Sequence, residues 1–434
     1  MESAGLRQRQ RAAGQATNPI VGHEPPRFTV NLSVAPEHRY DHIIPHVMDA
    51  ITDANVAAQF DDLIDMALPD MPFVQKCLHT FARMALRRVH SDEETAELRG
   101  IARATGISMH LLVALNVVLD LLLGCTSGGV RCKDGPDSQA RIVHFRTLDW
   151  GMDPLRNLIV ELDYVQQENG PVIATTVGYI GYVGVLTGVR HGLSMSLNFR
   201  PHHDRSTRGR RLAFRYHQLM VILGRRPSIS SALRRYLLPP TKVRKVARWR
   251  EKAPKPKEPP GIDAILDELA TSRSTAAYLI FGTPQRVYSV EKDHKSCSVA
   301  SDEHFLVTCN HDLADEKTPG AIHEAAQNVA PESGMDFLVD DSLDRKETVR
   351  GDWKRNVKRA TRRGKQRGVK TDEPAMGDGI KMKDVLGMLA RENISNEMTH
   401  YAVVMDPEGG KVMWRRAYQA GELGGGTSSS EEGD

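Results

Sequence analysis

The spacing of apolar residues changes near residue 124, and this change limits the fold more than any other feature of the sequence. Between residues 40 and 123, apolar residues recur every three or four positions, as at Ile44, Val47 and Ile51. That is the period of a helix that buries one face. From residue 141 onward, short segments alternate between apolar and polar residues, as strands do when one side is covered. The sequence therefore predicts an α+β protein in which a helical first part packs against a sheet-based body.

The same patterns give ranges for the individual elements. Ser91 is a plausible N-cap for one helix, and Gly106 and Ser108 separate that helix from the next. The predicted helices cover 93–105, 108–123, 214–223, 230–238, 263–271 and 381–392. The predicted strands cover 27–34, 141–148, 157–164, 172–176, 193–198, 277–282, 286–291, 296–301, 304–310, 399–405 and 411–416. Residues 200–211 read as a loop.

Composition narrows the class of protein. A chain of 434 residues can bury a sizeable core, and a net charge of +3 favours no strongly charged partner. The cysteines show no CxxC spacing, so neither a zinc site nor a disulfide scaffold is expected, and we expect no metal or cofactor; they are Cys77, Cys125, Cys132, Cys297 and Cys309. Residues 1–19 lack the apolar core of a signal peptide, and the longest apolar run is too short to span a bilayer. These features predict a soluble, intracellular protein.

Four segments stand apart by composition. Residues 1–24 and 421–434 are polar or low in complexity and are predicted to be disordered. Residues 239–260 and 349–378 are basic and look like insertions. Nucleic acid could bind such stretches, but they lack interleaved aromatic residues or a known module. A solvated face is the preferred interpretation, and attraction to anionic lipid surfaces is a further one.

The candidate for chemistry is Cys125, where the apolar run 111–123 ends in Gly124-Cys125-Thr126-Ser127. A strand carrying Arg146 and Asp149 follows it. A lone cysteine after an apolar helix is usually an inert core residue, but charged partners nearby suggest a nucleophile. Two other chemistries stay open with less weight. One is a papain-like pair of Cys125 with His144 or His191, and the other is a metal site at 202–204 or 310–312.

Three segments resemble one known family. Gly-Cys-Thr-Ser at 124–127, His-Phe-Arg-Thr-Leu-Asp-Trp at 144–150 and Leu-Arg-Asn-Leu-Ile-Val-Glu-Leu-Asp at 155–163 look like the acid ceramidase and N-acylethanolamine acid amidase family. That family consists of N-terminal nucleophile hydrolases. The resemblance implies a four-layer αββα fold with a helical N-terminal subunit at 25–124 and a catalytic portion at 125–420. It also implies self-cleavage between Gly124 and Cys125, and cofactor-free hydrolysis of an N-acylated lipid, ceramide or N-acylethanolamine, to a fatty acid and an amine.

The resemblance also assigns roles to residues. It makes Cys125 the nucleophile and, through its freed α-amine, the base. It makes Arg146 an orienting residue, Asp149 the partner of the α-amine, and Asn310 a donor to the oxyanion. Arg345 completes the polar network. The glycine-rich segment 178–188 resembles the family segment beside the substrate cleft, and the implied substrate-binding residues are Tyr179, Gly181, Tyr182 and Asn198.

The resemblance implies partners too, and the chain departs from the family in two respects. The expected partners are a lipid amide substrate, the cleaved pieces held together, and transiently an anionic membrane surface, but no nucleic acid. Phe199 stands where the family has a glutamate. The family is also lysosomal, whereas this sequence shows no signal, so a lysosome-like compartment remains open beside an intracellular one. The alternatives are a catalytically silent relative that binds lipid or protein, and, with less weight, a nucleic-acid-binding protein.

Overall fold

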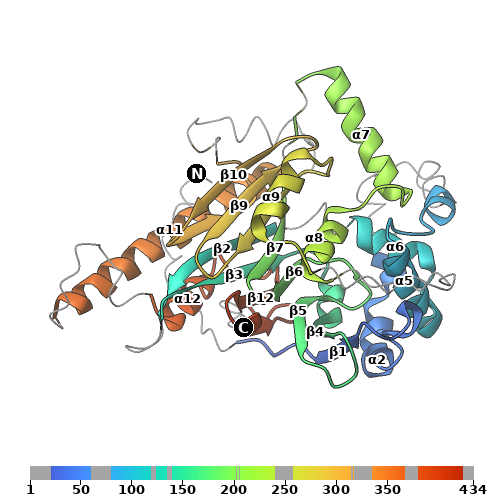
Figure 1. Ribbon diagram of the computed structural model, residues 1–434, viewed down its shortest axis with the longest axis horizontal. Helices are drawn as coiled ribbons and strands as arrows, with labels where there is room; N and C mark the ends of the chain where they lie inside the picture. Colours follow the sequence, from blue (N-terminus) through green and yellow to red (C-terminus); the bar gives the residue numbers. More distant parts are fainter. Residues whose placement is uncertain are drawn as a thin grey trace, which may run out of the picture.

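Two β-sheets lie face to face at the centre of the molecule (Figure 1). The computed structural model describes residues 21–59, 80–118, 124–133, 139–201, 203–204, 206–239, 258–313, 316, 335–366 and 380–423. Within those residues, strands of one sheet contact strands of the other, chiefly β2 (Gly124–Cys132) with β7 (Leu193–Phe199) and β11 (Phe305–Thr308) with β9 (Val287–Lys292). The space between the sheets is therefore a packed layer of side chains.

The larger sheet has eight strands. Its first strand, β1, runs parallel to its neighbour β4, and every other pair is antiparallel. The helical first part of the chain thus adds one strand to the body. In spatial order the strands are β1 (Arg27–Asn31), β4 (Ile159–Val165), β5 (Val172–Tyr179), β6 (Thr187–Arg190), β7 (Leu193–Phe199), β8 (Ala277–Gly282), β9 (Val287–Lys292) and β10 (Cys297–Asp302).

The smaller sheet carries Cys125. Its five antiparallel strands are, in order, β11 (Phe305–Thr308), β2 (Gly124–Cys132), β3 (Arg141–Asp149), β12 (Thr399–Asp406) and β13 (Lys411–Ala417). In the ladder between β2 and β3, Gly124 pairs with Asp149 and Ser127 pairs with Arg146. Strand β2 was not predicted from the sequence, because Gly124-Cys-Thr-Ser-Gly-Gly lacks the apolar alternation of a strand. Glycine is required inside it, since a Cβ on Gly128 would lie 2.3 Å from the carbonyl oxygen of Leu306.

Helices cover both outer faces. On the small sheet, α11 (Met335–Gln366) and α12 (Met382–Leu389) pack Val349 and Val385 against Val130, Val143 and Val307. On the large sheet, α8 packs on β6 and β7, and the N-terminal helices gather beside β1 and β4 (Figure 1). The N-terminal helices are α2 (Ile44–Ala54), α5 (Asp92–Thr105) and α6 (Met109–Val118), preceded by the 3-10 turn η1 (Pro36–His38). The second part of the chain adds the 3-10 turn η3 (Asp153–Leu158) and the helices α8 (Ile229–Leu237) and α9 (Ile262–Thr271). The predicted α+β fold with αββα layers is confirmed.

Most predicted elements are found within a few residues of their expected ends. Ser91 caps α5 by accepting from the Glu94 amide, and Gly106 ends that helix with φ of 74°. The loop predicted for 200–211 is wrong at its end, because Thr207 caps α7 (Arg208–Ile222). Helix α11 was not predicted, and residues 349–366 of the expected basic insertion belong to it.

Parts of several predictions fall outside the described residues. These are residues 119–123 of the helix before Cys125, most of the insertion 239–260, residues 367–378 of the second insertion, and nearly all of the predicted disordered ends. One small correction concerns the N-terminal end, where His23 forms a bridge with Ala417 rather than lying disordered. Among the described helices, none combines the length and apolarity that crossing a membrane requires.

Candidate active site

Cys125 lies on the inner strand β2 and is fully buried. Its Sγ accepts a hydrogen bond from Nη2 of Arg146 at 3.2 Å. Its backbone N–H donates to Oδ1 of Asn310 at 2.9 Å. One residue therefore has both its sulfur and its backbone nitrogen held by polar side chains.

Arg146 enters from the neighbouring strand β3 and is also fully buried. Its Nη1 donates to the carbonyl of Leu186, while its Nη2 reaches Cys125. The guanidinium carbon lies 5.9 Å from the centre of the Tyr401 ring, a cation–π distance. No carboxylate bonds to the guanidinium among the described residues, so the sulfur faces a cation without a direct anionic partner.

Opposing effects act on the Cys125 thiol. Burial raises its pKa above the ordinary value, and the negative charge of Asp149 acts in the same direction. The guanidinium groups of Arg146 and Arg345 lower the pKa. Burial prevails, so the thiol holds its proton more firmly than a free cysteine does.

Asp149 lies across the strand ladder from Gly124, next to the peptide bond that precedes Cys125. Its Oδ1 accepts from the hydroxyl of Thr399 at 2.7 Å, and its Oδ2 lies 3.7 Å from Nη1 of Arg345. Burial raises the pKa of this carboxyl to about 6, against the lowering effect of Arg345 and Thr399. A Cβ at residue 124 would lie 3.4 Å from the Cβ of Asp149, an ordinary contact distance, so residue 124 lies directly beside this side chain.

Asn310 and Arg345 close the other side of Cys125. Asn310 Oδ1 accepts from Arg345 Nη2 at 3.0 Å as well as from the Cys125 N–H. Arg345, on α11, also donates to the Thr126 hydroxyl at 2.9 Å. The Asn310 Nδ2 donates to the backbone carbonyl of Phe199 at 2.8 Å. This bond uses one of the two N–H groups of the amide, and the donation from Asn310 to an oxyanion stays a prediction.

The predicted substrate-binding residues lie in two places. Tyr179 donates to or accepts from Nδ1 of His400 at 2.8 Å, and its ring lies 6.5 Å from that of Tyr401, which covers Arg146. Gly181, with φ of +86°, and Tyr182 form the turn that follows β5.

Asn198 is held between the sheets rather than facing the thiol. Its Oδ1 accepts from the Ser127 hydroxyl at 2.7 Å, and its Nδ2 donates to the carbonyl of Thr308 at 3.1 Å. These contacts join β7 to β2 and β11. The substrate-binding role of all four residues stays a prediction.

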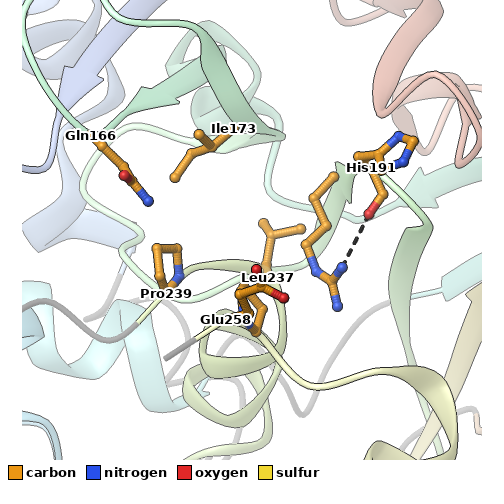
Figure 2. A pocket seen from close by; sticks show the side chains of 8 residues that line it. Gln166, Ile173, His191, Leu237, Pro239 and Glu258 are labelled. Atoms are coloured by element: carbon orange, nitrogen blue, oxygen red, sulfur yellow. Dashed lines mark hydrogen bonds between the residues drawn. The ribbon is translucent and has the colours of Figure 1, made fainter. Parts of the chain in front are cut away.

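Neither histidine of the papain-like alternative bonds to the thiol. Both ring nitrogens of His144 are taken by Ser194 and Ser196, at 3.0 and 2.9 Å, and burial lowers its pKa to about 3. His191 lines a separate cavity of about 230 Å³, where its backbone carbonyl accepts from Arg190 (Figure 2). No predicted catalytic residue lines that cavity.

The metal-site alternative also lacks support within the described part of the chain, where no group of three His, Cys, Asp or Glu side chains could hold an ion. His203 pairs with Asp293, and Asp312 pairs with Arg200 in a bidentate contact. His202 lies outside the described residues.

Four contributors to the site were not predicted from the sequence, namely Thr126, Leu186, Thr399 and Tyr401. Leu186 acts through its carbonyl oxygen, which no sequence pattern reveals. Tyr401 and Thr399 come from β12, more than 200 residues from Cys125, and only strand pairing brings them close. Alternation along 399–405 predicted the strand but not its neighbour.

The molecule has two stacked sheets between helices, which is the fold that the resemblance to N-terminal nucleophile hydrolases implies. On an inner strand, Cys125 is held at both its sulfur and its nitrogen. Comparison with known proteins agrees. A family model described as the beta subunit of N-acylethanolamine-hydrolyzing acid amidase matches residues 23–90. The resemblance to the acid ceramidase and N-acylethanolamine acid amidase family is confirmed.

Curated relatives bear the same two names. N-acylethanolamine-hydrolyzing acid amidase of Caenorhabditis elegans is 29% identical over 188 residues, covering 41% of this chain and 48% of the relative. The protein of that name from Rattus norvegicus is 31% identical over 167 residues, covering 38% and 42%. Acid ceramidase of Rattus norvegicus is 26% identical over 190 residues, covering 40% and 45%. The matches thus span less than half the length of these relatives.

A solved structure is also similar. It is that of the Caenorhabditis elegans N-acylethanolamine-hydrolyzing acid amidase ortholog, with a TM-score of 0.40 and 21% identity, covering 65% of this chain and 93% of the other.

Proposed function

We propose that the chain is a cysteine N-terminal nucleophile amidase that cuts itself between Gly124 and Cys125 and then hydrolyses the amide bond of an N-acylated lipid. The observation that carries the proposal is the double hold on Cys125, with Arg146 at its sulfur and Asn310 at its backbone nitrogen. An N-terminal nucleophile needs both atoms in place, because the sulfur attacks and the freed nitrogen moves protons. The names of the relatives supply the substrate class, ceramide or N-acylethanolamine.

Self-cleavage uses atoms that are already adjacent in the chain. The Cys125 sulfur attacks the Gly124 carbonyl carbon, the peptide C–N bond breaks, and a thioester forms while the nitrogen gains a proton. Water then hydrolyses the thioester, which leaves a carboxylate on Gly124 and a free thiol and amine on Cys125. The proposed partner of the new amine is Asp149, which pairs with Gly124 across the strand ladder.

Amide hydrolysis repeats these bond changes on a substrate. The Cys125 thiolate attacks the acyl carbon, and the leaving amine takes a proton from the Cys125 ammonium group. A thioester with the fatty acyl chain remains. Water attacks it, the α-amine accepts the proton, and the fatty acid leaves. A free α-amine has a pKa of about 8, so it exchanges protons readily near neutral pH.

We further propose that the two pieces, 25–124 and 125–420, remain associated. Glu97 of α5 is completely buried and accepts from Arg39 at 2.6 Å and from Arg234 of α8 at 2.7 Å. Arg234 belongs to the second piece, so this buried ion pair crosses the proposed cut. Strand β1 adds a backbone ladder with β4 across the same boundary. Both contacts would persist after cleavage.

We propose that α7 is the surface that meets anionic membranes. Leu212, Tyr216 and Leu219 are 67%, 53% and 40% exposed and lie on one face of this helix. Arg211 and Arg215 are exposed beside them. A helix with an exposed apolar face and flanking cations binds at the lipid interface. In Figure 1 this helix stands out from the body. The intracellular location stays a prediction, testable by cell fractionation.

The experiment that tests the amidase proposal is a release assay with N-acyl lipids. Purified wild-type protein should release fatty acid from a ceramide or an N-acylethanolamine, and Cys125→Ala protein should release none. Equal turnover by both would overturn the proposal. A wild-type protein that stays uncut and inactive would favour the alternative of a catalytically silent relative. Phe199, which stands where the family has a glutamate, also favours that alternative.

A further inference from the structure

The turn that follows β5 is held by a side chain from the opposite side of the proposed cut. Asn116 is a buried amide within the apolar helix α6. Its Nδ2 donates to the carbonyl of Gly181 at 2.8 Å, and its Oδ1 accepts from the N–H of Val183 at 2.8 Å. A buried polar side chain is costly unless it is fully bonded. Here the turn supplies two bonds, and the Leu112 carbonyl of α6 accepts a third at 2.8 Å.

The same turn is held a second time, from α8. Arg234 Nη1 donates to the Val183 carbonyl at 2.5 Å, while Nη2 binds Glu97. Two polar groups of Val183 and one of Gly181 are therefore satisfied by side chains of other segments. Turns usually satisfy such groups with their own backbone or with water. In this turn, side chains from other segments satisfy them and so fix its position.

The held turn leads directly to the nucleophile. The carbonyl of Leu186, three residues after Val183, accepts from Arg146, whose other nitrogen lies 3.2 Å from the Cys125 sulfur. At its other end the turn begins at Tyr179, whose ring contacts Tyr401 over the same guanidinium. A shift of the turn would move the Leu186 carbonyl directly, and it would act on the Tyr401 ring over the guanidinium through Tyr179.

We propose that Asn116 and Arg234 are positioning residues of the proposed amidase. The first piece of the cleaved chain then positions the active site of the second piece through Asn116 and through Glu97, which binds Arg234. The inference rests on the proposed function. Asn116 acts through the turn and touches no reacting atom. Its hydrogen bonds set where Leu186 and Tyr179 lie, and these set where Arg146 meets the sulfur. Displacement of such a group by about 1 Å costs on the order of 100-fold in rate.

The test uses two variants and a matched control in the full chain. Asn116→Leu keeps the volume of the side chain and removes its bonds to the turn. Arg234→Lys keeps the charge beside Glu97 and shortens the reach to Val183. Asn393→Leu is the control, because the side-chain amide of Asn393 also donates a hydrogen bond to another segment, to the Thr348 hydroxyl at 2.7 Å, away from the turn.

Two measurements are made on each protein. Hydrogen exchange should show lost protection of the Val183 amide in Asn116→Leu, with wild-type protection in the control. Turnover of N-acyl substrate should fall about 10- to 100-fold in kcat for both variants, with a change in melting temperature no larger than that of the control. Lost Val183 protection with unchanged kcat and KM would overturn the proposal and leave the amidase function standing.

A third readout does not need amidase activity. The pH midpoint for alkylation of Cys125 should shift upward in Asn116→Leu, because a less well-placed Arg146 stabilises the thiolate less. If the wild type hydrolyses no amide, the proposed function fails. The difference in alkylation midpoint between the wild type and Asn116→Leu then tests the positioning role on its own. An unchanged midpoint would overturn it.

Discussion

The guanidinium of Arg146 lies 3.2 Å from the sulfur of Cys125, and both groups are fully buried. A buried thiolate is unfavourable unless a positive charge lies close to it. Arg146 is the closest such charge, and it acts against the burial that raises the pKa of the thiol.

Arg146→Met should therefore raise the pH midpoint for alkylation of Cys125 and slow the reaction at pH 7 by about tenfold or more. The measurement is the rate of iodoacetamide labelling against pH. Arg190→Met is the control, because the bonds of Arg190 to described residues all go to backbone carbonyls in a different part of the molecule. Equal midpoints in the wild type and Arg146→Met would contradict the role.

Asp149 should make the chain less stable as the pH rises from about 4 to about 6. Its pKa is raised to about 6 in the folded protein, against about 4 in an unfolded chain. The folded state thus binds more protons within this window, and the unfolding free energy falls as the pH rises through it. The full effect is on the order of 3 kcal/mol.

Asp149→Asn should remove this slope, and the measurement is urea unfolding of both proteins across the window. Buried His144, whose pKa is lowered to about 3, acts in the opposite direction at acid pH. The difference between variant and wild type is therefore the quantity to compare. A difference that does not vary with pH would show that Asp149 keeps an ordinary pKa.

Glu97→Ala should destabilise the protein by roughly 3–5 kcal/mol, because it leaves Arg39 and Arg234 buried without their shared partner. In cleaved protein it should also release the first piece, which size-exclusion chromatography would detect. Glu303→Ala is the control, because its pair with Arg286 is exposed, and such pairs contribute about 1 kcal/mol or less. Pieces that stay together in Glu97→Ala would mean that the other contacts across the cut, such as the β1–β4 ladder and the bonds of Asn116, are enough to hold them.

Replacing Leu212 and Tyr216 of α7 by serine should weaken binding to vesicles that contain anionic lipid. Cosedimentation measures this, and added salt should weaken the wild type further, because salt screens the arginines. Val172→Ser with Val299→Ser removes similarly exposed apolar side chains, 47% and 46% exposed, elsewhere on the surface. If both double variants lose vesicle binding equally, α7 is not the membrane-binding surface.

Hydrophobic spacing predicted most of the fold because most strands and helices here bury one face. The alternation along 141–148 and 399–405 gave β3 and β12 nearly to the residue. It could not give β2, whose glycines and small polar residues are dictated by close neighbours such as Leu306. It also failed for α11, where the basic residues of 349–366 masked a buried face that includes Val349 and Ala360.

The candidate site was predicted in part. Cys125, Arg146, Asp149, Asn310 and Arg345 were chosen from the sequence through a family resemblance, and they lie together in the structure. Their roles remain predictions. The hold on Arg146 by the Leu186 carbonyl could not be predicted, because backbone groups carry no sequence signal.

The central claim is that Cys125 becomes a chain terminus, and mapping the N-terminus of the larger fragment of purified protein tests it most directly. The account predicts a fragment that begins at Cys125 in the wild type and an uncut chain in Cys125→Ala. A wild type that stays whole while it hydrolyses N-acyl lipids, or a cut at any other bond, would contradict it.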